Sequence, residues 1–223
     1  MNFSTKEMPK NLILLLIFNI KRGYNGNCFK NIVNGEKIMN ETLKTIHERR
    51  SVRAFKPDRI TKEELTTILE AGIAAPSAMN RQPWHFTAIQ NQEIIRRIED
   101  ENRGIVFSTP ENAANANRLN DPAHRSFYNA PTVIMFSGDI QNPWSICDCA
   151  LAMQNMVLAA KSLSIGTCII GSTGFAFQAV GLKDWFHEIG VPQGYSPLFA
   201  IAVGYAAADS EPKPRNKECV NFV

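Results

Sequence analysis

The segment Thr132–Ser137 reads Thr-Val-Ile-Met-Phe-Ser and is apolar almost throughout, so both faces that a strand presents carry apolar side chains. Such a strand is buried on both sides, because either face, if exposed, would leave large apolar groups in water. A second run, Leu198–Gly204, has the same character. The two runs predict strands of a sheet that is flanked by helices.

The segments around these runs predict helices and further strands. Leu43 and Ile46 recur at helical spacing within residues 40–50. Thr61 and Glu64 have the spacing of a capping box and open a helix that stops at Pro76. Further strands are predicted at Trp84–Gln90 and Thr167–Ile170, and further helices at Glu93–Asn102, Pro143–Ser164 and Phe175–His187.

The helix predicted over residues 143–164 is the longest. Pro143 suits its first position, and Gly166 is predicted to close it. One face is predicted to carry Ile146, Ala150, Met153, Val157 and Ala160. Residues 103–130 show little periodicity. Because helices and strands interleave without regular βαβ alternation or a G-x-G-x-x-G loop, we expect an α+β fold with a mixed sheet.

The composition excludes several classes of protein. The 223 residues, 44% hydrophobic and 20% charged, suit one globular domain. The net charge of +3 is too small to indicate nucleic-acid binding. The five cysteines form no C-x-x-C pair and the four histidines lack the spacing of metal ligands. We therefore expect no metal site and no disulfide framework, and a location in the reducing cytoplasm.

Residues 1–38 precede the first well-formed amphipathic segment, which opens at Met39. Their apolar run, residues 12–18, follows two lysines as in a signal peptide. The run is too short to span a bilayer, and no small-x-small cleavage site follows it. We expect residues 39–223 to form the domain and residues 1–38 to be a non-core extension, with secretion as the disfavoured alternative. One hypothesis is that the extension is translated upstream sequence.

The first candidate binding segment is the basic run Arg49-Arg50-Ser51-Val52-Arg53-Ala54-Phe55. Guanidinium forks match phosphate oxygens in pairs, and a hydroxyl or backbone amide can complete the shell. The apolar residues between the arginines indicate the edge of a pocket. The alternative is an ordinary solvated basic face.

The second candidate is the loop Ala75-Pro76-Ser77-Ala78-Met79-Asn80-Arg81-Gln82-Pro83-Trp84. Its prolines fix its shape. The amides of Asn80 and Gln82 can both donate and accept, as recognition of the carbonyl and ring-nitrogen edge of a flavin requires. The alternative is a plain connector from a helix to a strand, with Trp84 as a core anchor.

The third candidate is the proline-stiffened tail Glu211-Pro212-Lys213-Pro214-Arg215-Asn216-Lys217. It follows the last predicted strand. Its cations, added to those of residues 49–53, would suit a terminal phosphate. The alternative is a solvated tail.

Together these three segments resemble the nitroreductase family of flavoproteins, over essentially all of residues 40–217. The pairing of R-R-S-V-R-A-F with P-S-x-x-N-x-Q-P-W is the specific signal. Also similar are Asn129-Ala130-Pro131, Ala152–Met156 and Ser162–Gly166. The resemblance implies FMN bound at the interface of an intertwined homodimer, with NADH or NADPH as the electron donor.

The resemblance also implies which residues bind the cofactor, and no single chain completes the pocket. The subunit that holds the phosphate and ribityl groups would use Arg49, Arg50 through its backbone, Ser51, Arg53, Lys213 and Arg215. The other subunit would supply Pro76, Ser77, Ala78 and Asn80, with Gln82 supporting their loop.

Backbone amides near Ile170 and Gly171 would face the reactive edge of the flavin ring in such a protein. Many members of the family have a glutamate where this chain has Ile170, a departure that affects the side-chain environment more than the main-chain contact. A further asparagine that touches the flavin is expected within residues 102–117.

The activity that the resemblance implies is hydride transfer from NADH or NADPH to FMN. A nitroaromatic, quinone or similar small oxidant then takes up the electrons in ping-pong order. Because the flavin carries this chemistry, no catalytic side chain is expected. The alternatives are a specialised branch, acting in flavin destruction, reductive dehalogenation or azoline dehydrogenation, and a non-catalytic flavin-binding protein. No partner of the nucleic-acid or membrane class is expected.

Overall fold

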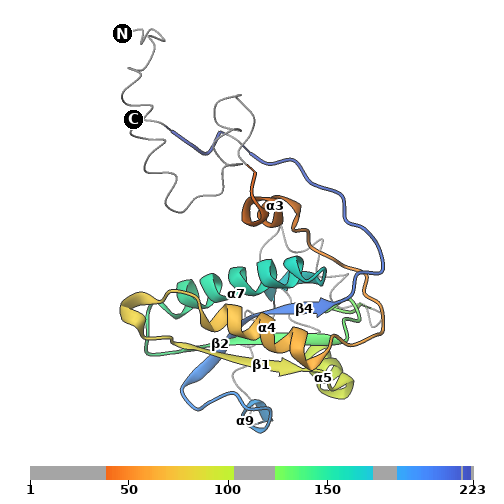
Figure 1. Cartoon of the computed structure of the whole chain (residues 1–223). Helices are drawn as coiled ribbons and strands as arrows, with labels where there is room; N and C mark the ends of the chain where they lie inside the picture. Colours follow the sequence, from red (N-terminus) through yellow and green to blue (C-terminus); the bar gives the residue numbers. More distant parts are fainter. Residues whose placement is uncertain (1–38, 103–123, 173–184, 217, 222–223) are drawn as a thin grey trace, which may run out of the picture. The chain divides into compact units, whose positions relative to one another are not determined.

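The computed structural model describes residues 39–102, 124–172, 185–216 and 218–221 (Figure 1). Of these, residues 39–47 belong to one unit and residues from Glu48 onward to another. Helix α3 (Glu41–Glu48) accounts for most of what is described of the first unit. The sheet and the other helices belong to the second.

A four-stranded sheet forms the centre of the second unit, in the order β1-β2-β4-β3. All three neighbouring pairs are antiparallel. A parallel pairing is present at the bridge between Ser51 and Thr167. The predicted α+β class is confirmed, and the two apolar strands β2 and β4 lie at the centre of the sheet. The strands are β1 (Trp84–Ile89), β2 (Thr132–Asp139), β3 (Gly166–Ile170) and β4 (Tyr195–Gly204).

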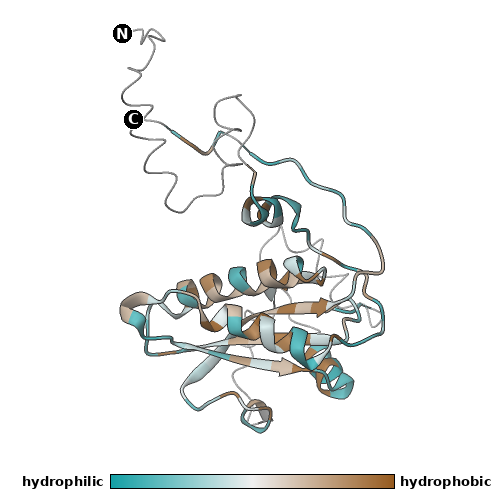
Figure 2. Ribbon diagram, in the orientation of Figure 1, coloured by the Kyte–Doolittle hydropathy of each residue, from teal (hydrophilic) through white to brown (hydrophobic). Residues whose placement is uncertain are grey.

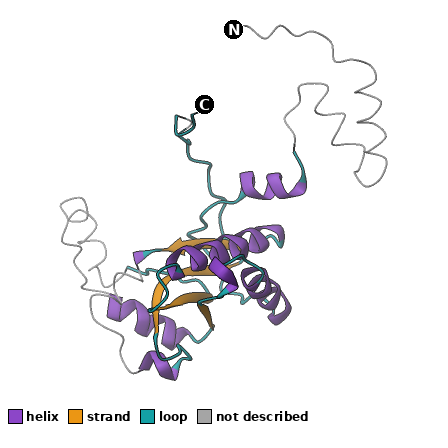
Figure 3. Ribbon diagram, turned by 90° about the vertical axis from the view of Figure 1, so that its left-hand side faces the viewer, coloured by secondary structure: helices purple, strands orange, loops and turns teal. Residues whose placement is uncertain are grey.

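Helices cover both faces of the sheet, as Figures 1 and 3 show from two directions. Along β2, Ile134 and Phe136 pack into the cluster with α4 and α7, whereas Val133 and Met135 pack into the cluster with α5 and α9. Figure 2 shows the apolar residues gathered on the strands and on α7. The helices are α4 (Lys62–Ile73), α5 (Gln92–Asn102), α7 (Ser145–Ser162) and α9 (Trp185–Glu188).

Local signals account for several boundaries. The capping box that opens α4 is confirmed, because the Glu64 amide donates to Thr61 Oγ1 at 3.1 Å and the Thr61 amide donates to Glu64 Oε2 at 2.8 Å. Strand β4 begins earlier than predicted, since Pro197 falls at a register shift where no ladder donor is needed. Of the helix predicted over residues 175–187, residues 173–184 lie outside the described part, and α9 covers the end.

Helix α7 differs from its prediction at both ends. It begins at Ser145, not Pro143, because Asn142 accepts a hydrogen bond from the Trp144 amide in a turn that precedes the helix. It ends at Ser162, and Ser164, with φ 61°, makes the left-handed step that was predicted for Gly166. Gly166 instead begins β3.

The inward face of α7 is confirmed at Ala150, Met153, Val157 and Ala160, which lie in or against the core, but not at its start. Ile146, predicted to face the core, is 57% exposed, whereas Asp148 and Cys149 in the same turn are buried. The helix carries apolar residues on both sides, so its periodicity alone did not fix which side faces the sheet. Among the described residues no helix is long and apolar enough to cross a membrane.

Candidate functional site

The basic run of residues 49–53 is held against the sheet by main-chain hydrogen bonds on two sides. The Val52 amide donates to the Thr167 carbonyl on β3 at 2.9 Å. On the other side, the Ala207 amide donates to the Ala54 carbonyl and the Lys56 amide to the Tyr205 carbonyl, both at 2.9 Å. The run therefore lies between β3 and the chain that leaves β4.

The C-terminal tail continues past this run and forms a cavity with it. Ser210 Oγ donates to the Ser51 carbonyl at 3.1 Å, which fixes the start of the tail. The cavity has a volume of about 410 Å³ and places five cationic side chains beside a single carboxylate, that of Glu211. Its lining residues are Arg49, Arg50, Ser51, Arg53, Ser210, Glu211, Pro212, Lys213 and Arg215. The structure thus brings together the first and third candidate segments.

The cationic groups in this cavity repel one another. Burial lowers the pKa of the half-buried Arg49 guanidinium, and the neighbouring charges of Arg215 and Arg50 lower that pKa further. A pKa lowered by like charges means that the cluster is short of negative charge. An anion with several acceptor oxygens, such as a phosphate monoester, would relieve this repulsion.

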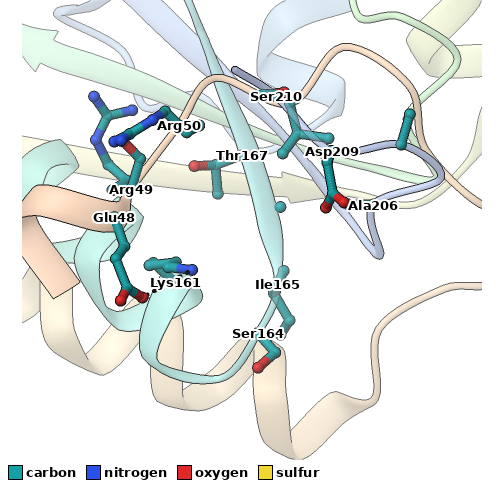
Figure 4. A pocket seen from close by; sticks show the side chains of 13 residues that line it. Glu48, Arg49, Arg50, Lys161, Ser164, Ile165, Thr167, Ala206, Asp209 and Ser210 are labelled. Atoms are coloured by element: carbon teal, nitrogen blue, oxygen red, sulfur yellow. Dashed lines mark hydrogen bonds and ion pairs between the residues drawn. The ribbon is translucent and has the colours of Figure 1, made fainter. Parts of the chain in front are cut away.

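A second cavity of about 350 Å³ lies on the other side of the run and shares Arg49, Arg50 and Ser210 with the first (Figure 4). Two acids offset most of the charge of its three cations. Lys161 Nζ lies 3.6 Å from Glu48 Oε2, and Asp209 also lines the wall. The tail side is therefore the stronger anion site of the two.

One arginine of the cluster is oriented by an aromatic ring. The Arg53 guanidinium lies 5.9 Å from the centroid of the Tyr128 ring, within the range of a cation–π interaction. Tyr128 and Asn129 both have φ 55°, an unusual conformation for residues other than glycine. Buried Glu99 supports this turn by accepting a 2.9 Å hydrogen bond from the Phe127 amide. Sequence reasoning missed Tyr128 and Glu99.

The Ala75–Trp84 loop lies at the other end of the unit (Figure 1). The Ala78 amide donates to Asp148 in the first turn of α7, whereas Lys161 in its last turn lines a cavity with Arg49. Thirteen residues of helix separate these two positions by about 20 Å. One chain therefore does not bring its own loop to its own arginines.

The Ile170–Gly171 segment lies at the far end of β3, four residues beyond the Thr167 pairing with Ser51. At the rise of an extended strand, Gly171 is about 13 Å from Thr167. Ile170 packs its side chain into the core. Gly171 is exposed, and a Cβ added there would meet no atom within 4 Å. Any ligand at this position would meet the main chain rather than the side chain of Ile170.

Two other kinds of catalytic group, a bound metal ion and an activated buried thiol, find no support among the described residues. These residues contain no group of three or more His, Cys, Asp or Glu residues arranged to hold a metal ion. Burial raises the pKa of the Cys149 thiol to about 12 and also raises that of Cys168, so neither thiol is poised as a nucleophile. Of the asparagines within residues 102–117, Asn102 ends α5 and the others lie outside the described part.

Comparison with known proteins identifies the family of this chain. The sequence pattern of the nitroreductase family matches residues 46–205. An FMN reductase (NADPH) of Bacillus subtilis is 27% identical over 189 residues, which cover 79% of this chain and 70% of the reductase. Two crystal structures of nitroreductases with bound FMN are similar, each with a TM-score of 0.75. The one from Desulfitobacterium hafniense is 35% identical and that from Bacteroides fragilis 32%, and the match covers 83% of this chain and 99% or 100% of theirs.

Proposed function

Because this chain belongs to the nitroreductase family, we propose that it is an FMN-dependent oxidoreductase that passes hydride from NADH or NADPH to a small oxidant. The observation that carries the proposal is the cavity of five cationic side chains built from residues 49–53 and the tail. The FMN-bound nitroreductases that share this fold support it. A reductase of the same family that uses NADPH supports the electron donor.

The residues of the cavity fit the phosphate of FMN. Arg49, Ser51 and Arg53 would hold the phosphate and ribityl groups, and Lys213 and Arg215 would reach the same phosphate from the tail. The side chain of Arg50 donates to the Arg49 carbonyl at 2.9 Å, which supports a contribution through its backbone. When bound, FMN supplies the hydride chemistry, and the protein supplies position and electrostatics.

The position of the Ala75–Trp84 loop supports a site shared by two subunits. Residues 76–80 would reach the flavin held by a second copy, because about 20 Å separates them from the arginines of their own chain. Helix α7 supports the same arrangement, since its outward side carries the exposed apolar residues Ile146 and Leu151, with Trp144 at its start. We propose a homodimer with two such sites.

The open main chain at Gly171 suits the reaction. A backbone amide there would stabilise charge that develops at the reactive edge of the ring, without any titrating side chain. The described residues contain no dinucleotide-binding subdomain, so NADH or NADPH would be held by stacking at this open position. The oxidant, a nitroaromatic, quinone or similar molecule, would occupy the same position afterwards.

We expect ping-pong kinetics from such a shared position. The purified protein should be yellow and should oxidise NADPH rapidly when a quinone is present, with parallel double-reciprocal lines when both concentrations are varied. Replacement of Cys149 or Cys168 by serine should leave this reduction in place. Intersecting lines would show a ternary complex and contradict the shared position, and a yellow protein that does not oxidise NADPH or NADH would be a non-catalytic flavin-binding protein.

We also expect FMN retention to depend on the dimer. When the protein concentration is lowered below the dissociation constant of the dimer, the subunits should separate and release FMN, because each site loses one of its two walls. Sedimentation velocity with detection of flavin absorbance measures both events in one experiment. A stable monomer that retains stoichiometric FMN would disprove the shared site.

A further inference from the structure

The Ser77–Gln82 segment has a backbone shape that needs external support. Met79, Asn80 and Gln82 have φ values of 55°, 53° and 48°, in the left-handed region that residues other than glycine rarely adopt. The hydrogen bonds that join the segment to itself are all local. The Asn80 amide donates to the Ser77 carbonyl and the Gln82 amide to Ser77 Oγ, both at 3.0 Å, and two further bonds of 3.2 Å run from the Arg81 amide to the Ala78 carbonyl and from Gln82 Nε2 to Asn80 Oδ1. Such a shape persists only where its surroundings hold it.

Asp148 provides that support. Its two carboxylate oxygens lie 3.2 and 3.3 Å from the Ala78 amide, and its side chain is 4% exposed. Within the described ranges, no other side chain outside residues 76–82 is hydrogen-bonded to them. The position of Asp148 in the first turn of α7 favours its negative charge, because the helix N-terminus is positive. A buried charge with this donor is a strong anchor.

The anchor determines which groups of the loop remain for a ligand. The Ala78 amide is used by Asp148, and Asn80 Oδ1 accepts from Gln82 Nε2 at 3.2 Å. With the side-chain amides oriented in this way, Asn80 presents its NH2 group as a donor, and Ser77 keeps its hydroxyl proton. These two donors match acceptor atoms such as the carbonyl groups of a flavin ring.

We propose that Asp148 is a positioning residue, which holds the Ser77–Gln82 segment in the shape that presents the Ser77 hydroxyl and the Asn80 amide to the flavin of the partner subunit. The part of this proposal that concerns the flavin rests on the proposed function. The part that concerns the anchor does not. Two measurements on the full-length protein separate them.

The first measurement is limited trypsin digestion, which needs no ligand. Arg81 is exposed within the segment, so cleavage after it reports release of the segment. We expect Asp148→Ala to raise the rate of this cleavage about tenfold or more, and Asp148→Asn to give an intermediate rate because its amide oxygen still accepts a hydrogen bond. Asn155→Ala is the matched control, since Asn155 Nδ2 bonds the Ala71 carbonyl at 3.1 Å from the same helix.

The cleavage at Lys161 in α7 distinguishes local release from general unfolding. In both Asp148 variants, the cleavage at Lys161 should be as slow as in the unaltered protein. In the Asn155→Ala control, the cleavage at Arg81 should also be as slow as in the unaltered protein. Equal rates at Arg81 in Asp148→Ala and the unaltered protein would overturn the anchor. If Asp148→Ala does not fold, the rate in Asp148→Asn decides.

The second measurement is FMN binding, with the visible absorption spectrum of the bound flavin as a signature of its ring environment. We expect Asp148→Ala to weaken FMN binding about tenfold and to shift the spectrum toward that of free FMN, with Asp148→Asn between and Asn155→Ala unchanged. Faster cleavage at Arg81 with unchanged FMN affinity and spectrum would keep the anchor and overturn its role at the flavin. If the unaltered protein does not bind FMN, the proposed function is wrong.

Discussion

Arg49→Ala is expected to lower the affinity for FMN by about ten- to a hundredfold. The variant would remove the proposed charge-assisted contact to the phosphate, and such a contact is worth roughly 1.5–3 kcal/mol. Arg49 is the best placed residue for this test, because it is half-buried and lies among the other cations of the cavity. Isothermal titration of the apoprotein with FMN measures the change.

Two controls make this result specific. Riboflavin lacks the phosphate, so its affinity should barely change in Arg49→Ala. Arg59 lines a different cavity, together with residues 90–93. Arg59→Ala removes the same positive charge there and should leave the affinity for FMN unchanged. Arg215→Ala should act in the same direction as Arg49→Ala. An Arg215→Ala protein with unaltered FMN affinity would show that the tail does not belong to the site.

Gly166→Ala is expected to destabilise the fold and weaken FMN binding together. A Cβ at this position would lie 2.9 Å from Val52 Cγ2, 3.0 Å from Val52 Cβ and 3.1 Å from the Gly204 carbonyl oxygen. Val52 is branched at Cβ, buried, and bonded through its amide to Thr167, so it has little freedom to move aside. The basic run would shift away from β3, at a cost of roughly 1–3 kcal/mol.

Denaturant unfolding of the apoprotein and titration with FMN measure the two effects of Gly166→Ala. Gly171→Ala is the control for stability, because a Cβ there meets nothing within 4 Å. If Gly166→Ala unfolds at the same denaturant concentration as the unaltered protein and binds FMN equally well, the run is not held as tightly to β3 as its hydrogen bonds indicate.

Local sequence signals predicted much of the fold. The structure contains the predicted capping box of Thr61 and Glu64, the strands β2 and β4 at the two apolar runs, and helix α5, which ends at Asn102 as predicted. Helix α7 was predicted, and of its predicted inward face only Ile146 was wrong, since Ala150, Met153, Val157 and Ala160 belong to or pack against the core. Its apolar residues exceed what one face needs, and only the tertiary structure shows that Asp148 faces inward while Ile146 faces out.

The site was predictable where a motif lies on contiguous residues. The basic run and the tail were each visible in the sequence, and the structure brings them together in one cavity, whereas their binding of a phosphate stays a prediction. Tyr128 and Asp148 were not predicted, because each acts on a residue some seventy positions away, Arg53 in one case and Ala78 in the other. Contacts of that separation leave no periodic or local pattern in a sequence.

The hydrogen bond between Ser210 and Ser51 joins residues 159 positions apart, and it belongs to the wall of the basic cavity. A contact between residues so far apart in the sequence forms late in folding, because most of the chain has to be ordered before the two residues can meet. During synthesis the arginines leave the ribosome long before the tail does. If this cavity holds the phosphate of FMN as proposed, the site stays incomplete until the tail has been synthesised and has met the arginines of the basic run.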